Sequence, residues 1–458
     1  MATLADLGTS PHSARSRWWW CAPLLIALVV GPLAAHNHAR LIRTTRYTAD
    51  ENDWNGRTYF FRLAFFDQNF SHPRWGEHDG IDHPHVAEFF IAASYLAHDE
   101  PIPAVPARNQ AWMQFTDIPH GERLAVARLP SAVLGAATAV VVGWIAWALT
   151  ARVAAGLFAG LSYACHPLAL ESQTRAMSDA SVGFFTCTAV LFTAVALRLG
   201  PGVPWGRVTA MVVAAATAGL AVGSKLTGVV ALVTTCGTFA AAAAWVYLSG
   251  GPRPGRWAAL AATACLLGAA ATIAANPSLY THPVDRFAEM IRHRWTVSRA
   301  QWEHWPDLQL DGPASRVEAL ERYLSWDYPP EAAHPINGLR IPLGICGLAY
   351  LAFHTAVAAR RRGGPPPHLT VLVWTAVLAG LLLPTLPLDW ARYFLPFVQC
   401  WEVLTACGIV LLFDGARAAV AFLLTRCRVP ADRSTDHGVE DAVTPAGVTY
   451  LPTTGTRQ

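Results

Sequence analysis

The sequence has 458 residues, of which 53% are hydrophobic and only 14% are charged. Soluble domains carry about a quarter charged residues, so this composition excludes an ordinary soluble protein. The formal net charge of +3 is small, and the basic residues form no continuous basic face, so nothing indicates nucleic-acid binding. The nine cysteines show no CxxC pair or metal-ligand spacing and are interpreted as small apolar residues.

Apolar runs repeat along almost the whole sequence, and each is close to the ~20 residues that cross the apolar core of a bilayer. The pattern predicts an all-α, polytopic membrane protein, a bundle of about ten transmembrane helices. The first run begins beside three tryptophans and is interpreted as an uncleaved anchor rather than a signal peptide. The expected spans are 18–36, 124–149, 153–170, 180–198, 207–223, 226–248, 257–275, 339–358, 369–387 and 393–413.

Positive charge is concentrated in alternate loops between these spans. Cytoplasmic loops carry an excess of arginine and lysine, so this side is predicted to face the cytoplasm. Residues 1–17 and a largely disordered tail, 414–458, are then cytoplasmic and flank a transmembrane domain at 18–413. The long loops 37–123 and 276–338 lie on the outer face. The arginines that set this orientation are Arg15, Arg17, Arg152, Arg198, Arg207, Arg253, Arg256 and Arg360 to Arg362.

The first outer loop gathers acidic and aromatic side chains. Ten acidic residues lie between Asp50 and Glu100. Ionisable groups so close to lipid are costly to hold, so a functional site is the first hypothesis. Residues 55–68 and 86–97, and residues 283–304 of the second loop, have the patterns of helices that lie in the membrane interface.

The acidic pair Asp50 and Glu51 follows the first span by a short stretch. On position alone, these residues are most simply explained as a solvated loop or the start of a helix. The functional alternative is a general base at a water-poor site, where desolvation raises the pKa of a carboxyl group.

A second cluster of polar residues follows in the same loop, where two acids and two histidines lie within seven residues. Such a set could bind a divalent metal, but its spacing fits no standard site, and a hydrogen-bonded loop explains it equally. The residues are Asp79, Asp82, His83 and His85.

Three cations are predicted on the same outer face. Arg175 and Asp179 are four residues apart and would form an ion pair on a helix. Lys225 is the only lysine in the sequence, and Arg392 is followed by Tyr393. Arg175 could form a salt bridge at a helix end, Lys225 could be a lysine that extends its ammonium to the membrane interface, and Arg392 could be an interfacial anchor. They could instead bind the phosphate of a lipid.

In order and type, these segments resemble the membrane-embedded GT-C glycosyltransferases, especially the branch of protein O-mannosyltransferases and aminoarabinose transferases. That family has an acidic pair, a His-Pro-Pro-Leu motif, an Arg-x-x-x-Asp turn, a Gly-Leu-Ala-x-x-x-Lys stretch and an Arg-Tyr before a proline. Here the second proline of the histidine motif is absent, and Glu88 replaces a basic residue that often follows it. The matching positions are Asp50-Glu51, His83-Pro84-His85-Val86, Arg175 to Asp179, Gly219 to Lys225, and Arg392-Tyr393 with Pro396.

The resemblance implies an inverting glycosyltransferase in the plasma membrane with an extracytoplasmic active site. A polyprenyl-phosphate sugar would be the donor, and a protein, glycan or lipid hydroxyl the acceptor. Asp50 would be the base with Glu51 as alternative or helper. Arg175, Lys225 and Arg392 would bind the donor phosphate, supported by Asp82, His83, Asp179 and Tyr393. The alternatives are a transporter or flippase for lipid-linked sugar, and an accessory subunit whose site has decayed.

Overall fold

The computed structural model describes residues 21–106, 121–199, 203–251, 253–326, 335–361 and 364–427. The expected cytoplasmic N-terminus and most of the expected tail lie outside these residues. Regular structure in the described part of the chain is helical, apart from one isolated β-bridge between Gln309 and Leu388. The predicted all-α class is confirmed.

The long helices follow the predicted spans closely, because each expected apolar run lies mostly within helical structure. Nine helices are long and apolar enough to cross a membrane within the described ranges. The helices of the bundle are α1 (Cys21–Ile42), α6 (Glu122–Thr150), α7 (Val153–Cys165), α8 (Pro167–Thr174), α9 (Asp179–Arg198), α10 (Pro204–Ser224), α11 (Val229–Leu248), α12 (Pro254–Ala274), α15 (Arg340–Arg360), α16 (His368–Val377) and α17 (Leu395–Cys427).

The predicted span 153–170 is bent rather than straight. Helices α7 and α8 meet at an angle of 62° and together make a tenth candidate span. His166 has an extended backbone between them, and the next residue is a proline. Proline disfavours the helical conformation in the residue before it, which explains why the helix breaks here.

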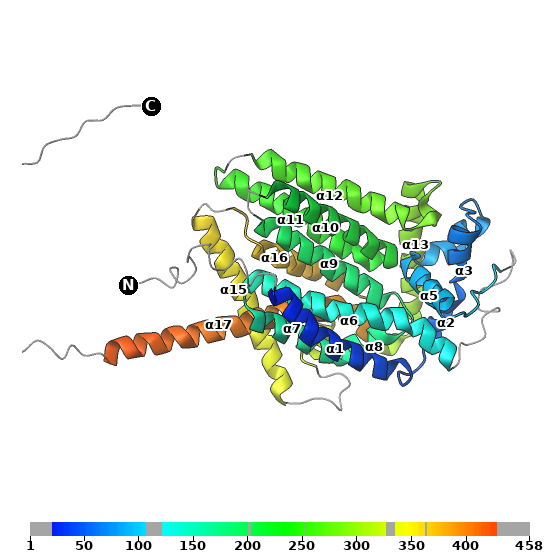
Figure 1. Cartoon of the computed structure of the whole chain (residues 1–458). Helices are drawn as coiled ribbons and strands as arrows, with labels where there is room; N and C mark the ends of the chain where they lie inside the picture. The colour runs from blue at the N-terminus through cyan, green and yellow to red at the C-terminus, as the bar shows by residue number, and fades with distance from the viewer. Residues whose placement is uncertain are drawn as a thin grey trace, which may run out of the picture. The chain divides into compact units, whose positions relative to one another are not determined.

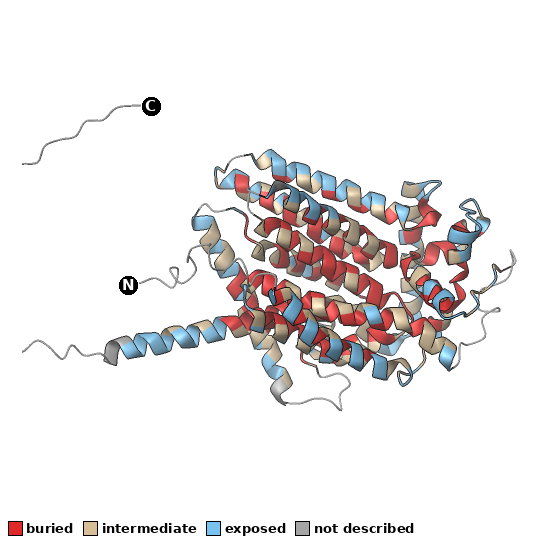
Figure 2. Cartoon of the chain, in the orientation of Figure 1, coloured by how far each residue is buried: buried red, intermediate tan, exposed pale blue. Residues whose placement is uncertain are grey.

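Side chains of the bundle divide between a packed interior and an apolar exterior. Helices α6 and α9 are buried over most of their length, whereas α12 and α15 are largely exposed (Figure 2). Helix α17 is mostly buried over residues 395–410 and mostly exposed over residues 411–424. The exposed side chains on the outer helices include Leu266, Ile345 and Phe353. Large exposed apolar residues on long helices suit contact with lipid rather than water.

The first outer loop forms short helices at one end of the bundle. These are α2 (Ala49–Gly56), α3 (Tyr59–Phe61), a π-helical turn (Arg62–Phe66), α4 (His78–Asp82) and α5 (Val86–Ala97). The prediction of a single helix over 55–68 is therefore wrong. Asn55 bonds through its side chain to the Glu51 carbonyl, Thr58 bonds to the Asn55 carbonyl, and Gly56 weakens the helix between them.

The other two expected surface helices are present. Helix α5 matches the predicted 86–97 but buries one face, including Ile91 and Tyr95, and packs on α6. Helix α13 (Pro283–His304) matches the second prediction, and α14 (Pro313–Leu324) follows it. Figure 1 shows α2, α3, α5 and α13 gathered at the same end of the bundle.

The last helix is longer than the predicted span 393–413. Helix α17 continues to Cys427, so the first part of the expected disordered tail is helical. Residues 428–458 lie outside the described ranges.

Candidate functional site

Asp50 lies in the first turn of α2 and faces an open cavity. Its side chain is 50% exposed and forms an ion pair with Arg392, which stands in a 3₁₀ turn (Ala391–Phe394) just before α17. The cavity has a volume of about 420 Å³ and is also lined by Arg175 and Asp389. Residues that are far apart in the sequence, Asp50 and Arg392, therefore meet at one opening.

Arg175 does not pair with Asp179 as the sequence predicted. Helix α8 ends at Thr174 and α9 begins at Asp179, so the two residues do not share a helix. Arg175 instead bonds to Glu171, one turn earlier, at 2.5 Å. Asp179 is left to pair with Lys225 at 2.8 Å.

Lys225, Asp179 and Arg392 line a second, narrower pocket that runs in between the helices. Lys225 occupies an extended link between α10 and the 3₁₀ turn at Leu226–Gly228, so its chain leaves the helix and its ammonium reaches α9. Tyr393 lies between two cations, with its ring centre 5.7 Å from both the Lys225 ammonium and the Arg392 guanidinium. Arg392 lines both pockets and so links the Asp50 opening to the Lys225 pocket.

Glu51 points away from this opening and is fully buried. Its two carboxylate oxygens accept hydrogen bonds from Arg128 of α6, each 2.7 Å long. The same carboxylate accepts bonds from the backbone N–H groups of Ala176 (2.9 Å) and Thr48 (3.2 Å). Every acceptor direction is thereby engaged, which suits a structural role in joining α2, α6 and the turn before α9.

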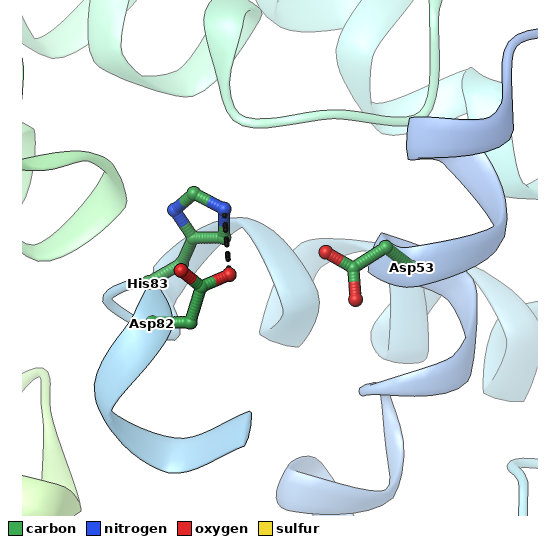
Figure 3. Close-up of side chains that lie close together, drawn as sticks. All are labelled: Asp53, Asp82 and His83. Carbon is green, nitrogen blue, oxygen red and sulfur yellow. Dashed lines mark ion pairs between the residues drawn. The ribbon is translucent and has the colours of Figure 1, made fainter. Parts of the chain in front are cut away.

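Asp82 and His83 lie in a separate cluster that includes an acid not selected from the sequence. Figure 3 shows Asp53 of α2 across from these two residues, and their possible ligand atoms all lie within 4.8 Å of one another. The side chain of Arg57 is only 1% exposed and contacts both Asp53 and Asp82 at 2.7 Å. The guanidinium therefore bridges the two carboxylates.

The pKa values in this cluster diverge. Burial raises the pKa of Asp53 to about 7, although Arg57 opposes the shift. Burial would also raise the pKa of Asp82, but His83, Arg57 and Arg294 hold it well below its usual range. Burial lowers the pKa of His83 well below its usual range, so the imidazole is neutral near pH 7.

A divalent metal does not fit this cluster as the side chains stand. Two oxygens and one nitrogen are suitable donors, but Arg57 already supplies the positive charge between the carboxylates. Arg294 of α13 adds a second cation, 2.9 Å from Asp82. Of the four residues suggested as ligands, Asp79 and His85 are elsewhere, bonded to Arg74 and Glu88 respectively.

Four residues of this region escaped the sequence analysis as site residues: Asp53, Arg57, Arg128 and Arg294. Arg128 and Arg294 pair with residues far away in the chain, so no local spacing marks them. Asp53 and Arg57 are an exception, because they are four residues apart on α2 and form an ion pair that an i, i+4 search finds.

The two residues that differ from the histidine motif, His85 and Glu88, contact each other. His85 and Glu88 are both fully buried, and His85 Nδ1 lies 2.7 Å from a Glu88 oxygen. Burial raises the pKa of Glu88, and the bond to His85 opposes the shift. The pair lies at the start of α5.

The comparisons with known proteins give similarity in structure but none in sequence. No family model matches the sequence, and no curated protein matches it. The structure is similar to ArnT from Cupriavidus metallidurans in its apo state, with a TM-score of 0.51 and 15% identity over 89% of this chain and 63% of that one. The chain has the GT-C fold.

Two further solved structures give weaker likenesses to this GT-C chain. The apo oligosaccharyltransferase of Archaeoglobus fulgidus has a TM-score of 0.49 and 13% identity, over 91% of this chain and 53% of that one. The donor-bound protein O-mannosyltransferase Pmt1–Pmt2 of S. cerevisiae has a TM-score of 0.35 and 15% identity, over 69% and 37%. The chain spans less than two thirds of the length of each of the three proteins.

Proposed function

We propose that this chain is an inverting glycosyltransferase that moves a sugar from a polyprenyl-phosphate donor to a hydroxyl group on a protein, glycan or lipid. The observation that carries the proposal is the position of Arg392, which pairs with Asp50 in one cavity and lines the Lys225 pocket next to it. A proton acceptor and phosphate-binding cations are therefore neighbours. The GT-C fold and the order of the motifs support the same class.

The donor phosphate would bind beside Lys225 and Arg392, with Arg175 at the rim of the cavity. Gly183, Leu382 and Leu386 continue the pocket between the helices and offer an apolar path for a lipid chain. A phosphate in this position would compete with Asp50 for the Arg392 guanidinium. Donor binding would thus release the carboxylate that is to accept a proton.

The transfer itself needs only groups of this site. Asp50 would take the proton of the acceptor hydroxyl while its oxygen bonds to the anomeric carbon, and the bond from that carbon to the phosphate oxygen would break. The polyprenyl phosphate leaves with an additional negative charge, which Lys225 and Arg392 would stabilise. Losing one such preorganised contact costs about 3 kcal/mol, or roughly a hundredfold in rate.

Glu51 enters this proposal as a positioning residue rather than as a second base. Its bonds to Arg128 and Ala176 hold the first turn of α2 against α6 and against the turn that carries Arg175. Asp50 is the adjacent residue, so its place at the opening depends on this anchor.

The decisive experiment replaces Asp50 in cells that lack the wild-type gene. Membranes carrying the wild type, Asp50→Asn or Asp67→Asn would be given radiolabelled polyprenyl-phosphate sugars, and cell-envelope glycans would be compared by mass spectrometry. A general base contributes about 10²–10⁴ in rate, so we expect Asp50→Asn to lose at least about a hundredfold. Asp67 is a control, because it lies in the same loop and its long contact to Arg62, 3.7 Å, is on the surface.

Three outcomes would contradict the proposal. Near-normal transfer by a folded Asp50→Asn protein would remove Asp50 from the mechanism. Movement of lipid-linked sugar across vesicle membranes, equal in the wild type and Asp50→Asn and without any transfer, would favour the transporter alternative. Absence of donor binding in the wild type would favour an accessory subunit.

A further inference from the structure

A large cavity between the helices lies at the end of the bundle opposite Asp50. It has a volume of about 960 Å³, within the range of small-molecule sites. Helix α9 starts at Asp179 beside Lys225 and ends at Arg198, and α10 returns from Pro204 to Ser224 beside the same lysine. The connections that line this cavity therefore stand a whole helix length away from the proposed transferase site.

The cavity walls combine cations with apolar surface. Four arginines and a histidine line it, and the apolar part includes Trp257, four leucines and the prolines before α16. The basic lining residues are Arg198, Arg207, Arg253, Arg256 and His368.

No carboxylate is close in sequence to any of these arginines. The sequence contains no aspartate or glutamate between Asp179 and Asp285, or between Glu331 and Asp389. All four arginines come from the first of these stretches, and His368 comes from the second. The segments that line the cavity therefore carry positive charge and no carboxylates of their own, which suits an anionic ligand.

Two of the arginines are held at the cavity by bonds to helix ends. Arg198 donates to the carbonyl oxygen of Ala148 in α6. Arg207 donates through Nε (3.2 Å) and Nη2 to the carbonyl of Leu199, and its guanidinium lies 4.9 Å from the Trp257 ring centre. A guanidinium has five N–H donors, so Arg207 keeps donors on Nη1 for a ligand.

The ordinary excess of arginine in cytoplasmic loops explains why these residues are basic. It does not explain why they converge on one cavity between the helices. Long side chains that only anchor a helix would spread outwards among separate lipid headgroups. Arg253 lines the cavity although its backbone is in the left-handed conformation, φ 63°, which is uncommon for residues other than glycine.

We propose that this cavity is a binding site for the phosphate headgroup of an anionic phospholipid from the membrane leaflet at this end of the bundle. The arginines would bind the phosphate, and Trp257, Leu260 and Val246 would contact the glycerol and upper acyl chain. Basic pockets between transmembrane helices are known to bind such headgroups. The inference does not depend on the proposed transferase activity.

The test measures lipid retention by the full chain purified in detergent. Native mass spectrometry would count phosphatidylglycerol and phosphatidylcholine bound to the wild type, Asp50→Asn, the double variant Arg253→Gln/Arg256→Gln, and the control Arg360→Gln/Arg361→Gln. The control removes two arginines on the same side of the membrane that do not line the cavity. Each arginine near an anionic surface contributes about 1 kcal/mol, so we expect the cavity variant to lose roughly tenfold or more in affinity for phosphatidylglycerol.

The wild type, Asp50→Asn and the control should prefer phosphatidylglycerol over phosphatidylcholine to the same degree. Equal binding of the two lipids by the wild type would overturn the proposal without reference to any variant. Equal loss in both double variants would reduce the effect to general surface charge and overturn it too. Displacement by millimolar inorganic phosphate, with no effect of the acyl chains, would assign the cavity to a soluble phosphate compound instead.

Discussion

The acidic pair at positions 50 and 51 shows how two adjacent carboxylates acquire different environments. Asp50 is half-exposed at an opening, whereas Glu51 is buried against Arg128. Successive helical residues point about 100° apart, so one can face the cavity while the next faces the interior. The division supports the proposed role of Asp50 in proton transfer and leaves Glu51 to hold the helix.

Arg128→Met should destabilise the protein severely. It leaves the Glu51 carboxylate buried without its cation, and breaking a buried ion pair from one side costs about 3–5 kcal/mol. The double variant Glu51→Leu/Arg128→Met should recover part of that loss. Arg43→Met is the control, because its ion pair with Glu122 is about 70% exposed on both sides and such pairs contribute about 0–1 kcal/mol.

Unfolding temperature in detergent would measure these differences. If Arg128→Met unfolds like Arg43→Met, the buried pair is not the anchor of α2. If the double variant is stable but transfers slowly, Glu51 acts through position rather than through folding alone.

Asp53 should make stability depend on pH in the opposite direction to an ordinary ion-paired carboxylate. Its pKa is about 7 in the folded chain, mainly because of burial, against 3.8 for the ordinary side chain. The folded state therefore binds more protons between about pH 4 and 7, and the contribution of Asp53 to stability falls as pH rises through that window. Asp53→Asn should remove this part of the profile.

The measurement is the difference in unfolding temperature between the wild type and Asp53→Asn from pH 5 to pH 8. We expect the wild type to lose stability relative to the variant as pH rises. A difference that is constant with pH would mean that Asp53 stays ionised throughout and that Arg57 outweighs burial.

At the scale of elements, close contacts between glycines set where the outer helices pack. A Cβ atom at Gly347 of α15 would lie 1.8 Å from the carbonyl oxygen of Leu404 in α17, and one at Gly408 would lie 2.0 Å from the Leu343 carbonyl. Small residues of this kind let transmembrane helices approach closely. This contact positions α17, and the Arg392 turn comes directly before that helix.

Gly347→Ala should therefore push α15 and α17 apart. Forcing additional atoms into a packed contact costs about 1–3 kcal/mol, and we expect a lower unfolding temperature and slower transfer. Gly415→Ala on α17 is the control, because nothing lies within 4 Å of its added Cβ. If both variants behave like the wild type, the contact does not constrain these helices.

At the scale of the whole molecule, the features that depend on local hydrophobicity could be predicted from the sequence. The features that depend on contacts between distant residues could not. The spans were predictable because the bilayer imposes a length on every apolar run. The break at His166 and the end of α2 at Gly56 depend on single residues inside those patterns. Arg128 and Arg294 reach the site only through the packing of α6 and α13, so no spacing around Asp50 or Asp82 could identify them.

The orientation of the molecule in its membrane also follows from the distribution of charge. The loop with ten acidic residues between Asp50 and Glu100 forms α2, α3 and α5 at one end of the bundle (Figure 1), and the segments 180–284 and 332–388 carry arginines without any carboxylate. The positive-inside rule predicts that Asp50 lies outside the cytoplasm. The proposed donor would then present its sugar on the outer leaflet.

Cysteine labelling on intact cells tests this orientation directly. Ser71 is exposed in the first outer loop, and Gly255 is exposed in the first turn of α12 at the other end. A membrane-impermeant maleimide should add label to Ser71→Cys on intact cells, above the signal of the native cysteines. It should add label to Gly255→Cys only after the cells are made permeable. The reverse pattern would place Asp50 on the cytoplasmic side, where the donor would have to present its sugar on the inner leaflet, and the lipid site proposed around Arg253 would then face the outer leaflet.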